Sequence, residues 1–249
     1  HPDFTKLTPD VFLSALGQSF YSLSIGMGCL CTFASYFKRD TNLTRSAVQI
    51  AVIDSVVAIL AGLMIFPAAF SVGVNPDSGP SLVFITLPNV FNQAFSSMPL
   101  VGYVVSILFY ALLALAALTS LISLHEVSTA FFHEELHITR KRAAMIVTVG
   151  CSVIGAFCSL SLGRDSSLQL FGKPLFEIFD FVTGQIFLPI AGLFTCLFIG
   201  WYLPHKLVKD EFTNNGTLRG RLFHLYLFCV KYACPLFIVL IFLHQFGLI

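Results

Sequence analysis

Charged residues are scarce in this sequence. Of its 249 residues, only 11% are Asp, Glu, Lys or Arg, whereas 56% are hydrophobic. An average soluble domain has roughly 25% charged residues, so the chain has too little charge to cover a surface that faces water. This composition excludes a disordered tail, a nucleic-acid-binding protein and a secreted disulfide scaffold.

A targeting segment and a metal-binding cysteine pattern are also missing from the sequence. The chain begins at His1, and its first ten residues are polar and include two prolines, which is unlike a signal or transit peptide. We therefore expect the chain to be a piece of a longer protein. The seven cysteines lie in apolar runs without His or Cys at zinc-ligand spacing, and we interpret them as small packing residues.

Long apolar runs are abundant. Six of them are long enough to cross a bilayer, which takes about 20 residues in a helix. Helices are favoured because main chain exposed to lipid must satisfy its own hydrogen bonds, and the alternation typical of a membrane β-barrel is absent. The predicted spans are residues 11–37, 46–70, 99–132, 143–162, 176–203 and 222–247. We expect one all-α integral membrane domain over residues 1–249.

Basic residues are unevenly divided between the two sets of loops. The loops after the first, third and fifth spans hold ten Lys and Arg, and the opposite side holds three, so the first set is predicted to be cytoplasmic. On the other side, residues 73–98 contain two half-apolar stretches that flank Pro88. We predict two short helices that fold back as an extracellular lid; the alternative is an interfacial hairpin without a gating role.

The first span is dense in glycine and serine between Gly17 and Gly28 (GQSFYSLSIGMG). This density predicts that the helix unwinds at mid-membrane. Carbonyl groups near Tyr21 and Ser22 would then lose helical partners, which is tolerated in a membrane only beside a cavity or ligand. Secondary transporters hold sodium and amino groups with such broken helices. Close helix packing through small residues is the alternative.

Two further polar features lie within predicted spans. Asp54 stands among apolar residues, where a carboxylate is costly. A bound cation would offset that cost, with Ser22 as a second oxygen ligand; a protonated structural aspartate is the alternative. Thr119 and Ser120 follow Ala116 in the third span and suggest a second ion site made of carbonyl and hydroxyl oxygens.

Three separate stretches resemble the neurotransmitter:sodium symporter family, in particular its bacterial amino-acid transporters: residues 16–28 (LGQSFYSLSIGMG), 81–91 (SLVFITLPNVF) and 116–120 (AALTS). The resemblance runs along the whole chain but covers only the second half of the family's sequence. It implies the sixth to eleventh helices of a five-plus-five inverted-repeat fold. It also implies sodium-coupled, alternating-access symport of amino acids in the cell membrane, as in a bacterial inner membrane. The expected partners are Na⁺, an amino acid, the lipid bilayer and the missing N-terminal half, with no nucleic acid and no enzymatic reaction.

The resemblance also implies roles for individual residues. The substrate-binding positions are Tyr21, Ser22, Ser24, Met27, Ser120 and Leu124. The sodium-binding positions are Ser22, Asp54, Ala116, Thr119 and Ser120. The gate positions are Tyr36 and Glu134 on the inside and Asp180 on the outside.

Two departures from the family pattern, Asp54 and Ala58, concern the ions, and one motif shared with some members concerns the cargo. Asp54 replaces an Asn ligand found in many members, and Ala58 lacks a hydroxyl for chloride. Because the carboxylate supplies negative charge itself, we expect transport that is independent of chloride. Family members with Gly-Met-Gly at positions like 26–28 include carriers of large hydrophobic or aromatic amino acids, so the resemblance implies a cargo of that class, and methionine adapts its shape readily.

Two other functions fit parts of the pattern. A non-transporting membrane receptor or scaffold would have the same spans. An intramembrane aspartyl protease would use Asp54 and Asp180, but such enzymes need two facing acids at one depth. They usually also carry Gly-x-Gly-Asp, whereas Cys29 follows Gly28 here.

Overall fold

The helices account for nearly all of the structure. The computed structural model describes residues 7–38, 41–71, 82–163, 169–170, 172–214, 216, 220 and 222–245. The described strands are β1 (Gln169–Leu170) and β2 (Lys173–Pro174), which pair antiparallel. Within the described ranges, five helices are long and apolar enough to cross a membrane: Leu43–Phe70, Pro99–Glu135, Arg140–Ser161, Leu175–Tyr202 and Phe223–Gln245. Together they make an all-helical fold suited to a bilayer.

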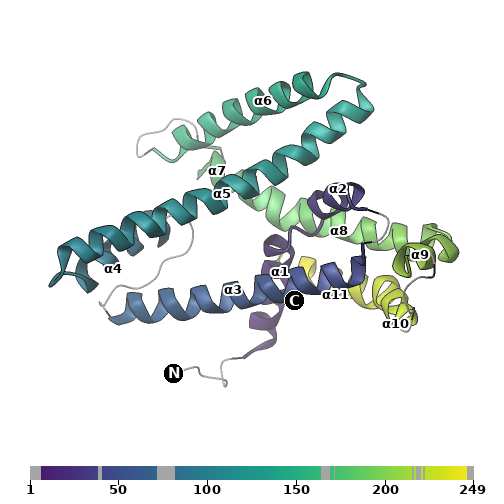
Figure 1. The fold of residues 1–249 in the computed structure, drawn as a ribbon, viewed down its shortest axis with the longest axis horizontal. Helices are drawn as coiled ribbons and strands as arrows, with labels where there is room; N and C mark the ends of the chain where they lie inside the picture. The colour runs from purple at the N-terminus through teal and green to yellow at the C-terminus, as the bar shows by residue number, and fades with distance from the viewer. Residues whose placement is uncertain are drawn as a thin grey trace. The chain divides into compact units, whose positions relative to one another are not determined.

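The first predicted span, residues 11–37, contains two short helices. They are α1 (Pro9–Ser22) and α2 (Cys29–Ser35), and Figure 1 shows them as separate helices. The next three long helices are uninterrupted: α3 (Leu43–Ser71), α5 (Pro99–Glu135) and α6 (Arg140–Ser161). Their bounds lie close to those of the predicted runs, because each run is limited by polar or charged residues.

Each of the last two long helices is built from several pieces. The first comprises α7 (Leu175–Phe181), η3 (Val182–Phe187), α8 (Leu188–Leu197) and η4 (Phe198–Tyr202). The second comprises α10 (Phe223–Phe228), η5 (Cys229–Ala233) and α11 (Cys234–Gln245), and the short helix α9 (His205–Phe212) lies between them in the chain. The segments labelled η are π-helical turns.

Prolines explain where these π-helical turns occur. Each turn, including η2 (Leu82–Thr86), ends two residues before a proline: Pro88, Pro189, Pro204 and Pro235. Proline has no N–H to donate, and its ring crowds the carbonyl four residues earlier. The preceding turn therefore widens, which shifts hydrogen bonds to the wider i to i+5 pattern.

The predicted lid is described only in its second part. Residues 73–81 of that segment lie outside the described residues, and η2 continues directly into α4 (Leu87–Ala94). Pro88 lies in the first turn of α4, where a missing N–H is tolerated. One continuous helical piece therefore runs from Leu82 to Ala94.

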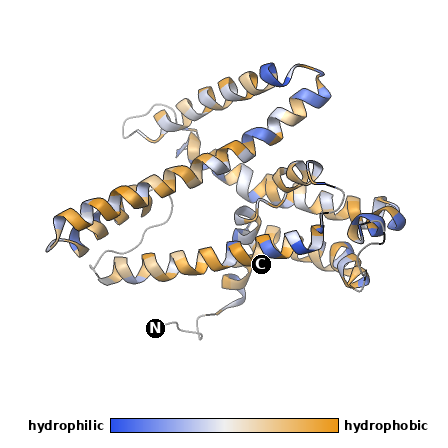
Figure 2. Ribbon diagram, viewed as in Figure 1, coloured by the Kyte–Doolittle hydropathy of each residue, from blue (hydrophilic) through white to orange (hydrophobic). Residues whose placement is uncertain are grey.

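The long helices are hydrophobic around their whole circumference. Figure 2 shows hydrophobic residues along α3 and along much of α5, with hydrophilic residues gathered where α5 meets α6 and on α9. In α3 and in α5, no residue of the most apolar 18-residue stretch is buried inside the protein. A helix that is apolar on every side and still exposed requires a membrane or further protein around it.

The chain divides into two compact units. Unit 1 comprises residues 1–47 and 124–249, and unit 2 comprises residues 48–123. In unit 1, α11 packs against α8, and α1 packs against both; Leu188, Ile238 and Ile241 are buried there. In unit 2, η2 and α4 pack on α5: the Tyr110 hydroxyl donates to the Val83 carbonyl at 2.7 Å. Each unit is described by itself below.

Candidate functional site

The interruption between α1 and α2 is a defined backbone structure. Ser24, Gly26 and Gly28 all have positive φ angles, of 53°, 84° and 80°. The amide of Ser24 donates to the Tyr21 carbonyl, and the amide of Ile25 donates to the Phe20 carbonyl. These two bonds form a Schellman motif, with Ser24 at the left-handed position that glycine usually occupies. The helix therefore ends at a fixed place, and the chain turns away after Ser22.

Close main-chain packing holds the interruption against α8. A Cβ atom on Gly26 would lie 2.6 Å from the Leu188 carbonyl oxygen and 3.2 Å from the Gly192 nitrogen. A Cβ atom on Gly192 would in turn lie 3.0 Å from the Phe20 ring. Two glycines thus let the two main chains touch, which no larger residue would permit.

A second helix starts directly after the interruption. Gly28 is the N-cap of α2 in a left-handed conformation. Its carbonyl accepts from the Thr32 amide at 2.9 Å and from the Thr32 hydroxyl at 3.1 Å. Met27 precedes it, and its amide donates to the Ser24 carbonyl. The predicted substrate positions Ser22, Ser24 and Met27 therefore belong to one short, well-defined segment.

A cavity of about 550 Å³ lies between α1, the α7–η3 region and the end of α11. Tyr21, a predicted substrate-binding residue, and Asp180, the predicted outer-gate residue, both line this cavity. Gln18, Gln185 and His244 also line it. The structure therefore brings two sequence-predicted site residues to one polar cavity within unit 1.

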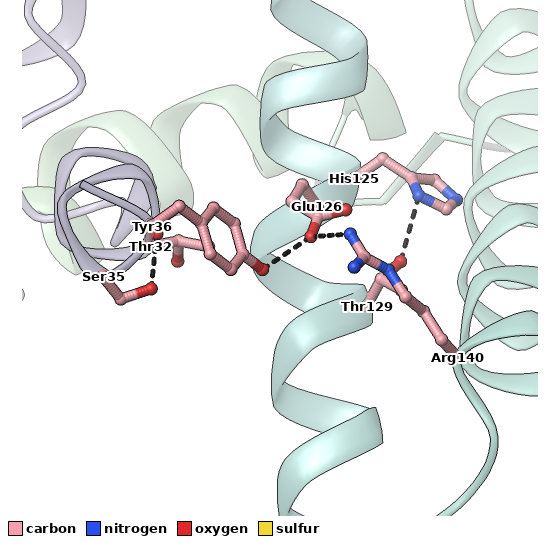
Figure 3. Close-up of polar contacts among 7 residues, drawn as sticks. All are labelled: Thr32, Ser35, Tyr36, His125, Glu126, Thr129 and Arg140. Carbon is pink, nitrogen blue, oxygen red and sulfur yellow. Dashed lines mark hydrogen bonds and ion pairs between the residues drawn. The ribbon is translucent and has the colours of Figure 1, made fainter. Parts of the chain in front are cut away.

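A polar network joins α2, α5 and α6, also within unit 1 (Figure 3). The Tyr36 hydroxyl donates to Glu126 Oε1 at 2.8 Å, and Arg140 forms an ion pair with the same oxygen. Tyr36 and Glu134 were both expected at the inner gate, without a stated partner for either. The structure gives the Tyr36 hydrogen bond to Glu126, two helical turns before Glu134 on α5.

Next to this network, His125 links α5 to α6 through a hydrogen bond. Its Nε2 lies 2.9 Å from the Thr148 hydroxyl, and its Nδ1 lies 3.1 Å from the Thr129 hydroxyl. Thr148 itself donates to the Ala144 carbonyl, so its hydroxyl must accept from His125. His125 therefore donates through its Nε2–H group to Thr148.

Unit 2 holds the remaining predicted sodium ligands. The Thr119 hydroxyl donates to the Ala116 carbonyl at 2.8 Å, and Ser120 follows on the same helix, α5. Asp54 lies half-buried in the middle of α3. No group of three His, Cys, Asp or Glu suited to a metal ion occurs in the described ranges.

Sequence reasoning missed Glu126, His125 and Arg140 as a connected group. The available clue was a carboxylate and an imidazole placed side by side within an apolar run, since polar residues inside membrane spans are costly and are usually functional.

The fold and these features define a multi-pass, all-helical membrane protein in which an irregular segment between the short helices α1 and α2 packs closely against α8. The chain belongs to the sodium:neurotransmitter symporter family, whose family model matches residues 1–248. The family expected from the three sequence stretches is thereby confirmed, and it is a family of transporters.

Known relatives agree with this assignment. The chain is 36% identical over 253 residues to the uncharacterized sodium-dependent transporter YhdH of Bacillus subtilis, covering 100% of this chain and 54% of that protein. It is 34% identical over 244 residues to an uncharacterized sodium-dependent transporter of Haemophilus influenzae, covering 97% of this chain and 51% of that protein. The chain thus spans about half the length of the curated relatives it matches.

A solved structure matches the fold. The crystal structure of MhsT in complex with L-phenylalanine superposes with a TM-score of 0.84 at 37% sequence identity, covering 98% of this chain and 54% of MhsT. The all-helical architecture is therefore that of a transporter of this family.

Proposed function

We propose that this chain forms the second half of a sodium-coupled amino-acid symporter that works by alternating access. The observation that carries the proposal is the interruption between α1 and α2, held by main-chain contact with α8 in a member of this family. Irregular main chain is stable at membrane depth only where it is buried in protein or lines a cavity. We place this interruption at mid-membrane, where transporters use such segments to bind ions and amino groups.

The first sodium site and the substrate site share ligands in this proposal. Ser22 and Asp54 bind the sodium ion, and the substrate carboxylate completes its shell of oxygens. The substrate ammonium binds the carbonyls of Tyr21 and Ser22 and the hydroxyl of Ser24. The Tyr21 carbonyl accepts one hydrogen bond from Ser24 and has room for a second. Because each ligand stabilises the other, binding of sodium and substrate is coupled.

The second sodium site uses Ala116, Thr119 and Ser120. The Thr119 hydroxyl donates its only proton to the Ala116 carbonyl, so its oxygen keeps lone pairs for a cation. A pair of oxygens held 2.8 Å apart on one helix face suits a small hard cation.

The two gates lie on either side of the interruption. On the outside, Tyr21 closes over the substrate, and Asp180 pairs with a basic group from the half of the transporter that precedes this chain. The cavity that both residues line supports this assignment. On the inside, Tyr36 acts with Glu126, and Glu134 pairs with another partner. The segment 73–98 acts as the outer lid.

The proposed cargo is a large hydrophobic or aromatic amino acid. Met27 provides an adaptable wall, and Ser120 and Leu124 provide the floor. The related MhsT was crystallised with L-phenylalanine, which supports this class. Asp54 supplies the fixed negative charge that makes chloride unnecessary. The bacterial relatives support a bacterial inner membrane as the location.

Uptake by the complete transporter tests the proposal. Proteoliposomes containing it should accumulate radiolabelled L-phenylalanine when sodium is higher outside, and should not do so with a potassium gradient of the same size. Binding of phenylalanine without accumulation would indicate a receptor instead. Uptake that is equal with both cations would contradict sodium coupling.

A further inference from the structure

A lysine lies well inside the last apolar helix. Lys231 is eight residues after Phe223, the first residue of that span, or about 12 Å along a helix axis. Its side chain turns toward η4 and α9, within unit 1. The ammonium Nζ lies 3.2 Å from His205 Nε2 and 5.3 Å from the centre of the Trp201 ring.

Close packing of two π-helical turns fixes this position. The turns η4 and η5 contact each other, and Gly200 is the point of contact. A Cβ on Gly200 would lie 3.0 Å from Lys231 Cγ and 3.3 Å from Lys231 Cα. The Trp201 indole N–H also donates to the Lys231 carbonyl at 3.4 Å. The methylene groups of the Lys231 side chain are therefore held against η4, and its ammonium group is directed toward His205 at the start of α9.

Among the described residues, no anionic side chain forms an ion pair with the ammonium of Lys231. An ammonium group only donates, so Nζ donates one of its protons to His205 Nε2. The Trp201 ring attracts the charge without neutralising it. In the described part of the chain, the ion pairs are Arg140 with Glu126 and His244 with Asp10, and neither involves Lys231. Two ammonium protons thus remain available to an external acceptor.

The surroundings are those of a membrane interface. The rings of Trp201 and Tyr202 are 60% and 78% exposed at the end of an apolar helix, where aromatic residues mark the headgroup level. Lys206 and Lys209 follow on the exposed side of α9. A phospholipid phosphate at this level would meet the ammonium of Lys231, whereas the two lysines of α9 are balanced on the same helix by Asp210 and Glu211.

We propose that Lys231, together with Trp201 and His205, binds the phosphate of an anionic phospholipid from the cytoplasmic leaflet. Basic pockets between membrane helices on the cytoplasmic side bind anionic headgroups in this way. The inference rests on the membrane orientation assumed in the proposed function, but not on sodium or amino-acid binding. It adds a lipid site on the outer edge of the helix bundle.

Photolabelling of the complete transporter tests this site. The protein is reconstituted in phosphatidylcholine vesicles with a trace of photoactivatable phosphatidylglycerol, and labelled peptides are mapped. We expect labelling within residues 201–231. Lys231→Gln should reduce it about fivefold, which corresponds to about 1 kcal/mol for one lysine near an anionic surface. Lys231→Arg should retain it, and the matched control Lys141→Gln, an exposed basic residue of α6, should leave it unchanged.

Three results would overturn the proposal. The first is equal labelling of these peptides in the Lys231→Gln and wild-type proteins. The second is equal labelling of the wild-type protein by photoactivatable phosphatidylcholine, a comparison that needs no variant and therefore does not depend on folding of Lys231→Gln. The third is loss of labelling when excess inorganic phosphate is added, which would identify a free anion as the ligand. None of these measurements requires transport, so failure here is separate from failure of the symport proposal.

Discussion

Replacing Gly26 by alanine should disrupt the interruption between α1 and α2. The new Cβ would lie 2.6 Å from the Leu188 carbonyl oxygen, whereas an ordinary contact of this kind is at least 3.4 Å. The oxygen belongs to the main chain and the position of a Cβ is fixed by its own main chain, so neither atom can rotate away. The segment must move off α8 by about 0.8 Å, and ion or substrate sites tolerate displacements of only about 0.5 Å.

The energetic cost of this substitution has two parts. Alanine at a φ of 84° pays about 1–2 kcal/mol for the left-handed conformation. Overpacking of a tight contact adds about 1–3 kcal/mol. The sum of about 2–5 kcal/mol should appear as a lower melting temperature of the purified complete transporter and as a loss of sodium-dependent phenylalanine binding of at least about tenfold.

Gly155→Ala provides the matched control. Gly155 lies within α6, and a Cβ there meets no atom within 4 Å. Alanine favours helix over glycine by about 1 kcal/mol, so this variant should melt at the same or a higher temperature and bind normally. If Gly26→Ala behaved like this control, the close contact with α8 would not be a feature of the working protein.

Three further substitutions test other parts of the account. Ser24→Gly should remove the strain of a positive φ angle at this position and raise the free energy of unfolding by about 1 kcal/mol. It should also weaken phenylalanine binding, because a hydroxyl group is lost. Unchanged affinity in a binding titration would argue against Ser24 as a ligand. Glu126→Gln breaks the ion pair with Arg140, whose side chain is 62% exposed. The substitution should lower the free energy of unfolding by at most about 1 kcal/mol in a thermal unfolding experiment. A larger loss would mean that the ion pair is less exposed to water than in this structure. Asp54→Asn should make uptake respond to chloride, and uptake that stays indifferent to chloride would show that the carboxylate is not its substitute.

The long apolar helices and the position of the break between α1 and α2 could be predicted from the sequence for simple physical reasons. A run of apolar residues between charged clusters has one stable form in a membrane, so its limits nearly fix the helix limits. Glycine and serine at 22–28 weaken a helix, which indicated the break. The particular residue that ends the helix was not predictable: Ser24 takes the left-handed position, although Gly26 and Gly28 are the better formers of that conformation.

Side-chain partners were harder to predict than helices. Tyr36 was expected at the inner gate without a named partner, and its hydroxyl donates to Glu126, which lies about 12 Å from Glu134 along α5 at helical rise. The depth that Tyr36 reaches depends on the shape of the interruption, and sequence spacing does not encode that shape. The π-helical turns before Pro189 and Pro235 could not be predicted in the same way, since a proline shows where the hydrogen bonding must change but not how.

The most direct test of the central claim is equilibrium binding of radiolabelled L-phenylalanine to the complete transporter at a series of sodium concentrations, repeated as sodium binding at a series of phenylalanine concentrations. Shared oxygen ligands at the interrupted helix require that sodium raises phenylalanine affinity and that phenylalanine raises sodium affinity by the same factor. Phenylalanine affinity that is identical in sodium and in choline would contradict the account.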